Sequence, residues 1–237
     1  MGPDRFNSFQ LIHQESDIWF GLSPEAKLES IKTFASKEIK ALREKIDTYI
    51  NNNPLFSKTL KPIEFDHSAP GIIKKMIIAS KKAGTGPMAT IAGTFSQYIG
   101  ERIIRNFDPD ELILENGGDN YLVINKPLLA SIYAGNSPLS EKVAIKILPE
   151  YIPLGICTSA GSFGSSRSFG KADAVTIVSK NTILADAMAT SLANKIKNKN
   201  DIDKIINQAE QIPEVLSCII IKDDKLAVNG KLEIELL

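Results

Sequence analysis

The order of strands and helices that the sequence predicts occurs twice along the chain, and this repetition constrains the fold more than any single motif. In each half, apolar alternation and turn residues predict antiparallel strands before and after helices. The predicted strands are residues 8–22 (a hairpin), 112–116, 121–125, 129–133, 143–148, 174–178, 215–221 and 225–228. We therefore expect an α+β fold with antiparallel sheets and paired helices, made by tandem duplication of one unit.

Helices are predicted between these strands. Ser23 and Pro24 form a typical helix start, and a stripe of apolar residues continues to about Ile50. The Gly84–Pro87 turn introduces another helix, whose first turns contain Ala89, Thr90 and Gly93. Such small residues let a neighbouring backbone or a ligand come close. In the second half, the predicted helices are residues 183–196 and 202–208, and the apolar segment 72–79 fits either a strand or a helix.

The two halves meet near residues 125–128. We expect a first unit at residues 1–126 and a second at 127–237, together forming one domain. The tripeptide Met-Ala-Thr occurs at 88–90 and again at 188–190, in helices that the duplication would make equivalent.

Composition excludes several classes of protein. Lys and Arg number 28, as do Asp and Glu, and no dense basic run is present, so a nucleic-acid-binding function is not expected. The longest apolar runs are too short to span a membrane, and the first residues do not resemble an export signal. The two cysteines, Cys157 and Cys218, lie far apart, which indicates neither a disulfide framework nor a zinc site. These features predict a cytoplasmic protein, and antiparallel sheet edges favour a homo-oligomer.

Asp186 and Thr190 are the first candidates for catalytic and metal-binding residues. They are four residues apart on a predicted helix, so both side chains can point at one site. Two oxygen ligands side by side suit Mg²⁺, which completes its coordination shell with water and phosphate oxygens. The alternative is a solvated helix face with an aspartate near the positive end of the dipole. Alanines at 185, 187, 189 and 193 favour a close-contact surface instead.

A Gly/Ser-rich segment, Gly155–Gly170, precedes this helix and predicts a loop that binds a diphosphate-bearing small molecule. Glycine and serine expose backbone N–H groups to ligand oxygens at little steric cost. The candidate binding residues are Thr158, Ser159, Gly161, Arg167 and Ser168. A flexible linker has a similar composition, but it would rarely contain two phenylalanines and an arginine. The segment is not a Walker loop, because Ala172 follows Gly170-Lys171 where Ser or Thr would be needed.

Gly117, Gly118 and Asp119 form a tight turn between two predicted strands and are further candidates for ligand binding, although such a triplet is also common in ordinary turns. Gly84–Ala89 matches the loose dinucleotide pattern G-x-G-x-x-A, with Glu115 as a ribose ligand, but antiparallel strands argue against that fold. Cys157 is more typical of a small buried residue than of a nucleophile.

The motifs GPMATIAG, ENGGD, GICTSAG, SFGKADAVTIV and ADAMAT together resemble a family related to the ApbE proteins, which are FAD:protein FMN transferases. The resemblance covers nearly the whole chain and implies two T-fold-like units in tandem. It implies that Asp186 and Thr190 bind Mg²⁺ together with the backbone carbonyl of Ala92, and that FAD or FMN is the ligand. Two features depart from the transferases: Gly93 stands where they usually have a lysine, and Ser168-Phe169-Gly170 replaces a histidine-containing segment.

The sequence therefore leaves two functions open. The first is a Mg²⁺-dependent enzyme that cleaves FAD at its diphosphate or transfers FMN. The second is a non-catalytic flavin- or nucleotide-binding protein.

Overall fold

The computed structural model describes residues 5–161 and 170–237 and contains two antiparallel sheets. The larger sheet has the strand order β1-β2-β3-β4-β7-β8-β9-β10, and the smaller has the order β11-β6-β5. The strands are β1 (Asn7–His13), β2 (Ser16–Leu22), β3 (Leu112–Asn116), β4 (Asp119–Val123), β5 (Leu128–Ser131), β6 (Val143–Ile147), β7 (Leu154–Ser159), β8 (Ala174–Ser179), β9 (Val215–Lys222), β10 (Lys225–Gly230) and β11 (Ile234–Leu236).

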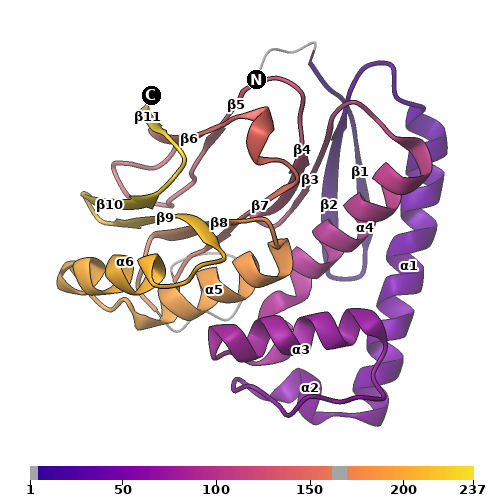
Figure 1. Cartoon of the computed structure of the whole chain (residues 1–237), viewed down its shortest axis with the longest axis horizontal. Coiled ribbons are helices and arrows are strands. Elements are labelled where there is room, and N and C mark those ends of the chain that lie inside the picture. Colours follow the sequence, from indigo (N-terminus) through magenta and orange to yellow (C-terminus); the bar gives the residue numbers. More distant parts are fainter. Residues whose placement is uncertain (1–4, 162–169) are drawn as a thin grey trace.

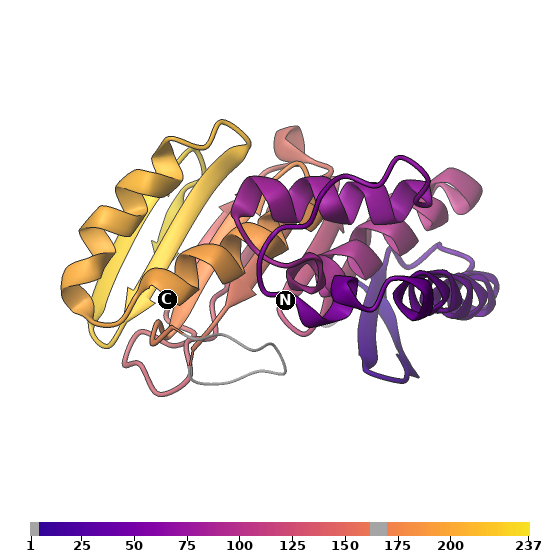
Figure 2. The same ribbon diagram turned by 90° about the horizontal axis from the view of Figure 1, so that it is seen from below.

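The helices cover one face of the larger sheet, and the smaller sheet packs on the opposite face (Figures 1 and 2). The α-helices are α1 (Leu28–Asn52), α2 (Leu55–Lys58), α3 (Gly71–Ala83), α4 (Ile91–Phe107), α5 (Thr182–Lys195) and α6 (Ile202–Glu210). Short 3₁₀ helices are η1 (Pro87–Thr90), η2 (Pro149–Tyr151) and η3 (Lys199–Asp201). Two hydrophobic cores result, one between the larger sheet and the helices and one between the two sheets.

Strand alternation divides the side chains of the larger sheet between these cores. On β7, Cys157 belongs to the helix-side core, while Leu154 and Ile156 belong to the core between the sheets. On β4, Tyr121 faces the helices and Leu122 faces the smaller sheet. Neighbouring residues on a strand therefore lie in different environments. Only polar groups on the same face of the sheet can share a site.

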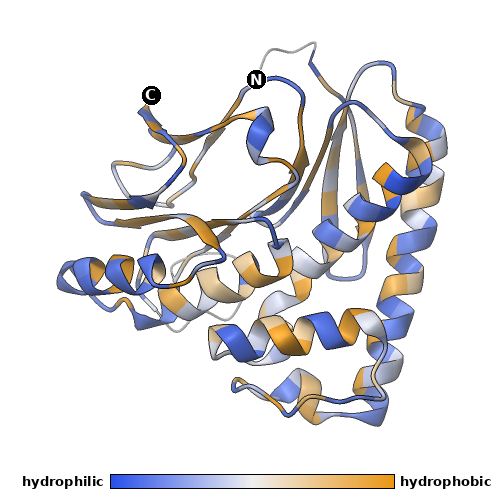
Figure 3. Ribbon diagram, in the orientation of Figure 1, coloured by the Kyte–Doolittle hydropathy of each residue, from blue (hydrophilic) through white to orange (hydrophobic). Residues whose placement is uncertain are grey.

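Helix α5 is the most buried helix at the centre of the molecule. Residues 182–189 are all buried, and α5 appears pale or orange along most of its length, whereas α1 and α6 alternate blue and orange (Figure 3). The alanines flanking Asp186 are all buried, so they form the close-contact surface expected from the sequence. A helix that is apolar on all sides is typical of a core position.

Helices α4 and α5 approach each other closely at Gly93. A Cβ atom on Gly93 would lie 2.6 Å from the carbonyl oxygen of Thr182 and 2.8 Å from Cβ of Asp186. No larger residue fits unless the helices move apart. The small residues at the start of the predicted helix therefore do admit a neighbouring backbone, that of α5.

Several expectations require correction. The first helix begins at Leu28 rather than after Ser23, because the Ser23 backbone N–H donates to the Glu111 carbonyl and keeps that residue at the end of the β2–β3 pair. The segment 72–79 belongs to helix α3, so no strand precedes the dinucleotide-like pattern. The Gly/Ser-rich segment starts as a strand, β7, because its first residues pair with β4 and β8.

The second half also differs from the expected order in detail. Strand β6 pairs with β5 and with β11 in the smaller sheet, so β5 and β6 do not bracket α5 and α6; that role belongs to β7, β8, β9 and β10. The two Met-Ala-Thr tripeptides are not at equivalent positions, since the first lies in η1 and the second lies in the middle of α5. The α+β fold with antiparallel sheets and helices is confirmed. The division near residue 126 stays a prediction; it would fall between β4 and β5.

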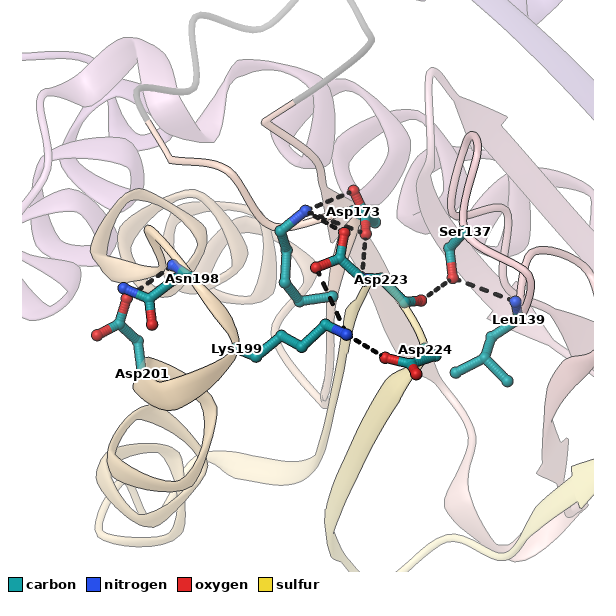
Figure 4. Close-up of polar contacts among 9 residues, drawn as sticks. Ser137, Leu139, Asp173, Asn198, Lys199, Asp201, Asp223 and Asp224 are labelled. Carbon is teal, nitrogen blue, oxygen red and sulfur yellow. Dashed lines mark hydrogen bonds and ion pairs between the residues drawn. The ribbon is translucent and has the colours of Figure 1, made fainter.

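A network of ion pairs and hydrogen bonds connects the β9–β10 turn to neighbouring segments (Figure 4). Lys222 contacts Asp173 and Asp223, and the backbone N–H of Asp223 also donates to Asp173. The Asp223 carbonyl accepts a hydrogen bond from Ser137, and Lys199 contacts Asp224. This network joins the entry to β8, the turn of the larger sheet and the segment that connects β5 to β6.

The Gly93 contact predicts a large difference between two Gly→Ala substitutions. Gly93→Ala should lower the free energy of unfolding by about 1–3 kcal/mol, because overpacking forces α4 and α5 apart. Gly71→Ala, at the start of α3, should be neutral or slightly stabilising, since a Cβ there meets nothing within 4 Å. Chemical denaturation of both variants measures the difference, and equal stabilities would contradict the packing.

Candidate functional site

Two buried carboxylates lie beneath the N-terminus of α4. Asp186 comes from the second turn of α5, and Asp119 is the first residue of β4. Each is 8% exposed, and the charge of Asp186 contributes to raising the pKa of Asp119. The sequence-predicted residues Asp186 and Asp119 are therefore brought together from the two halves of the chain.

Asp186 caps a helix that has no cap of its own. Its Oδ2 accepts a hydrogen bond of 2.9 Å from the backbone N–H of Gly93, the third residue of α4, and Thr90 provides no side-chain cap. The first amides of a helix have no partner within the helix and carry a partial positive charge, so a carboxylate placed there is favoured. Asp186 is thus a structural residue as well as a candidate ligand.

The capping is reciprocal. Gln97 of α4 reaches the start of α5, where its Oε1 accepts hydrogen bonds from the backbone N–H groups of Thr182, at 2.9 Å, and Ile183, at 3.3 Å. Asn181 caps the next amide, that of Leu184. The contacts of Gly93 with Asp186 and of Gln97 with Thr182 show that α4 and α5 run antiparallel and satisfy each other's N-termini.

Asp119 is held by the sheet and by α4. It lies opposite Cys157 in the β4–β7 pair, and its carboxylate interacts with the Cys157 thiol. Its backbone carbonyl accepts a 2.8 Å hydrogen bond from Ser96 of α4. In the preceding turn, Gly117 and Gly118 have φ angles of +63° and +98°, a backbone region that favours glycine. The turn fixes where Asp119 enters the site.

Burial raises the pKa values of this cluster. Desolvation raises the pKa of Asp186 to about 7, although the Gly93 and Ala92 amides oppose the shift. Desolvation and then the Asp186 charge raise the pKa of Asp119 well above its ordinary value. Burial and then the two carboxylates raise the pKa of the Cys157 thiol, so it is a poor nucleophile in this state.

Ala92 and Thr190 border the same region. The Ala92 carbonyl accepts hydrogen bonds of 3.2 Å from Asn116 Nδ2 and from Ser96 Oγ, so a metal ion would displace or share one of these donors. Thr190 is half-buried, one turn beyond Asp186 on α5. Ser96 and Asn116 were missed from the sequence. Asn116 stands directly before the Gly-Gly-Asp turn, which is the one signal that could have identified it.

The candidates on β7 divide between the two faces of the sheet. Ser159 shares the helix-side face with Cys157, and within residues 5–161 and 170–237 its buried hydroxyl has no hydrogen-bond partner. Thr158 points to the other face, where its hydroxyl lies 2.8 Å from that of Thr176. Because neighbouring strand residues alternate, Thr158 and Ser159 do not place their side chains in one site.

Contacts along β7 and α5 place Ser159 beside the C-terminal half of that helix. Gly155 lies against Thr182 at the start of α5, and Gly170 lies against the Ala193 carbonyl near its end. Gly161 in turn approaches Gly170, so β7 follows α5 from its start toward its end. Ser159 consequently lies closer to the Thr190 turn of α5 than to its N-terminus.

The backbone amides proposed to bind phosphate already have partners at two positions. The Gly118 N–H donates to Glu115 Oε1 at 2.7 Å, and the Gly161 N–H donates to the Ala172 carbonyl at 2.8 Å. Arg167 and Ser168 lie outside the described residues. Their proposed contacts with a diphosphate stay predictions.

The chemistry of the cluster fits a divalent cation only in part. Two buried carboxylates with raised pKa values have no lysine or arginine among their hydrogen-bond and charge partners in the described residues, so a cation would relieve their repulsion. Residues 5–161 and 170–237 contain no group of three or more His, Cys, Asp or Glu side chains placed to hold a metal. Mg²⁺ suits such a sparse donor set because it uses few protein ligands.

A protein-family model described as AbpE bacteria matches residues 1–214. The chain belongs to this family. A UPF0280 protein of Methanococcus vannielii is 37% identical over 212 residues, which cover 87% of this chain and 85% of the relative. A UPF0280 protein of Methanocaldococcus jannaschii is 35% identical over 195 residues, covering 80% of this chain and 78% of the relative. The resemblance stated from the sequence motifs is confirmed.

The fold of this AbpE family member is similar to solved ApbE structures. The apo flavinyl transferase ApbE from Pseudomonas stutzeri aligns with a TM-score of 0.64 at 12% identity, covering 96% of this chain and 95% of that one. The ApbE protein from Thermotoga maritima aligns with a TM-score of 0.61 at 12% identity, covering 95% and 97%. At this identity the similarity establishes the ApbE-like fold. Across residues 5–161 and 170–237, no helix combines the length and apolar character needed to cross a bilayer.

The raised pKa of Asp186 predicts how the stability of the metal-free protein depends on pH. Its folded-state pKa of about 7 exceeds the ordinary value of about 3.9, so its contribution is fully present below pH 4 and is lost as pH rises toward 7. Asp186→Asn removes this titration while keeping an oxygen acceptor for Gly93. The wild type should therefore lose stability relative to the variant between pH 4 and 7, as measured by denaturation in EDTA. Parallel pH profiles would contradict the burial of an ionisable Asp186.

Proposed function

We propose that this protein is a Mg²⁺-dependent enzyme that cleaves FAD at its diphosphate or transfers FMN from it. The observation that carries the proposal is the buried Asp119–Asp186 pair, which combines two like charges with no cationic partner among the described residues. Its structural neighbours are named flavinyl and flavin transferases, which supports a flavin as the substrate class, and the resemblance of the sequence motifs to FAD:protein FMN transferases makes FAD the first substrate to test.

In this proposal Asp186, Asp119 and the hydroxyl of Thr190 hold the metal, with the Ala92 carbonyl as a further ligand. A bound Mg²⁺ supplies charge neutralisation for the diphosphate oxygens. The chain contributes position: reciprocal capping fixes Asp186, and the Gly-Gly turn fixes Asp119. Ser159, on the same face of the sheet as Cys157, offers a hydroxyl that has no hydrogen-bond partner among the described residues. A buried hydroxyl without a partner is costly, which is expected where a ligand provides the missing hydrogen bond.

A second candidate is a non-catalytic, cytoplasmic flavin- or nucleotide-binding protein. The specific observation in its favour is Gly93, whose position against α5 has no room for the lysine that the transferases usually have. Such a protein would keep the ligand pocket without the chemistry.

The deciding experiment is incubation of the purified protein with FAD and Mg²⁺, followed by identification of all products and of any protein-bound flavin by mass spectrometry. The enzyme hypothesis predicts release of AMP that stops on addition of EDTA and in Asp186→Asn. Asp203→Asn is the matched control, because Asp203 also lies early in a helix but is exposed and pairs with Lys225 on the surface. Intact FAD bound in stoichiometric amount would support the binding protein, and AMP release that persists in Asp186→Asn would refute the site.

Strand alternation predicts that removing two neighbouring hydroxyls, those of Ser159 and Thr158, has different effects on the affinity for FAD. Ser159→Ala should weaken binding of FAD with Mg²⁺ by about tenfold, the effect of losing one hydrogen bond of about 1.4 kcal/mol. Thr158→Val, which removes a hydroxyl on the opposite face, should leave the affinity unchanged and lower stability only slightly. Titration calorimetry on both variants provides the comparison. A larger loss of affinity in Thr158→Val than in Ser159→Ala would place the ligand on the opposite face of the sheet and contradict the proposal.

A further inference from the structure

The larger sheet ends in β1, a strand without the features that usually protect an edge. Natural edge strands carry charges, prolines or bulges, or are kept short, because their free backbone groups can pair with another chain. The sequence of β1, NSFQLIH, has no Asp, Glu, Lys, Arg or Pro, and its seven residues pair with β2 without interruption. Ile12 on this strand is 71% exposed.

The other sheet edges in the described part of the chain are better protected. Strands β5 and β11, at the edges of the smaller sheet, have four and three residues. Strand β10, at the far edge of the larger sheet, begins with Lys225, which pairs with Asp203 of α6 at 2.9 Å. The unprotected edge is therefore β1.

We propose that β1 is a dimerisation edge, where a second copy of this chain adds its own β1 in antiparallel orientation. A strand without charged residues can face its own copy without like-charge repulsion. Antiparallel pairing also separates the two β1–β2 turns, whereas parallel pairing would bring each Glu15 next to its copy. Arg43, 3.4 Å from the Glu15 carboxylate, offsets this charge only in part, because the Glu15 side chain is 81% exposed.

The sequence of β1 selects one register. Pairing all seven residues requires a two-fold axis at Gln10, which places Gln10 opposite its own copy and Phe9 opposite Leu11 of the second copy. Phe9 and Leu11 both face the helix-side core, so this register extends that core across the interface with two aromatic–aliphatic pairs. On the other face, Ile12 packs beside Ser8 of the second copy and loses its exposure.

Sedimentation analysis of the full chain over a range of concentrations tests the interface. The wild type should form a dimer, and Ile12→Lys should weaken it at least tenfold by placing two charges on the edge. Val228→Lys is the matched control, since Val228 is 42% exposed on the opposite edge strand, and it should leave the dimer unchanged. A wild type with the mass of one chain at every concentration, or a dimer weakened by Val228→Lys and not by Ile12→Lys, would overturn the proposal.

Cross-linking tests the register independently of affinity. Gln10→Cys places one thiol of each copy side by side across the axis, so a short bis-maleimide should link two chains. Ser8→Cys lies on the same sheet face, but its two copies would be about 14 Å apart, because four residues of strand separate them. It should not be linked by the same reagent. The native cysteines are buried and provide no competing reaction. Equal linking of both variants, or linking of Ser8→Cys alone, would exclude this register.

Discussion

The contact between the N-termini of α4 and α5 is the constraint on which the candidate site depends. Each helix supplies the cap that the other needs: Asp186 accepts from Gly93, and Gln97 accepts from Thr182 and Ile183. Neither exchange is possible unless the backbones nearly touch, and that approach requires a residue without a Cβ at position 93. The two halves of the chain are thereby joined through buried polar groups as well as through apolar packing.

The same contact gives Asp186 two roles that compete. As a cap it stabilises α4 through a charge-assisted hydrogen bond, and as a buried carboxylate beside Asp119 it pays a desolvation penalty that raises its pKa to about 7. A proton or a cation can relieve that penalty. The arrangement therefore couples the occupancy of the site to the packing of α4 against α5, since both act on one side chain.

Much of this could be predicted from the sequence. Period-2 and period-3.6 patterns identified most strands and helices, and the small residues around Gly93 and Asp186 indicated close packing, which the structure confirms. The strand β7 was missed because Gly155, Thr158 and Ser159 look like loop residues; only pairing with β4 and β8 makes them a strand. That tertiary effect also separates Thr158 from Ser159. Ser96 could not be found because its hydrogen bond connects two elements whose proximity no local pattern encodes, and for Asn116 the adjacent Gly-Gly-Asp turn was the only local signal.

The two faces of the larger sheet differ in the residues that they bury, and this difference follows from these constraints. On the helix side, glycine and alanine allow the close contacts that bury Asp119, Asp186 and the Ser159 hydroxyl. On the other side, apolar residues of β3, β4, β7, β8 and β9 pack against the smaller sheet, and the buried carboxylate of Glu111, directly before β3, is paired with Arg5. The Asp119–Asp186 pair, which has no cationic partner among the described residues, therefore lies on the helix-side face, where the capping geometry holds Asp186. A substitution that separates α4 from α5 should disturb the site before it disturbs the sheet, because the strand ladder from β1 to β10 does not pass through that contact.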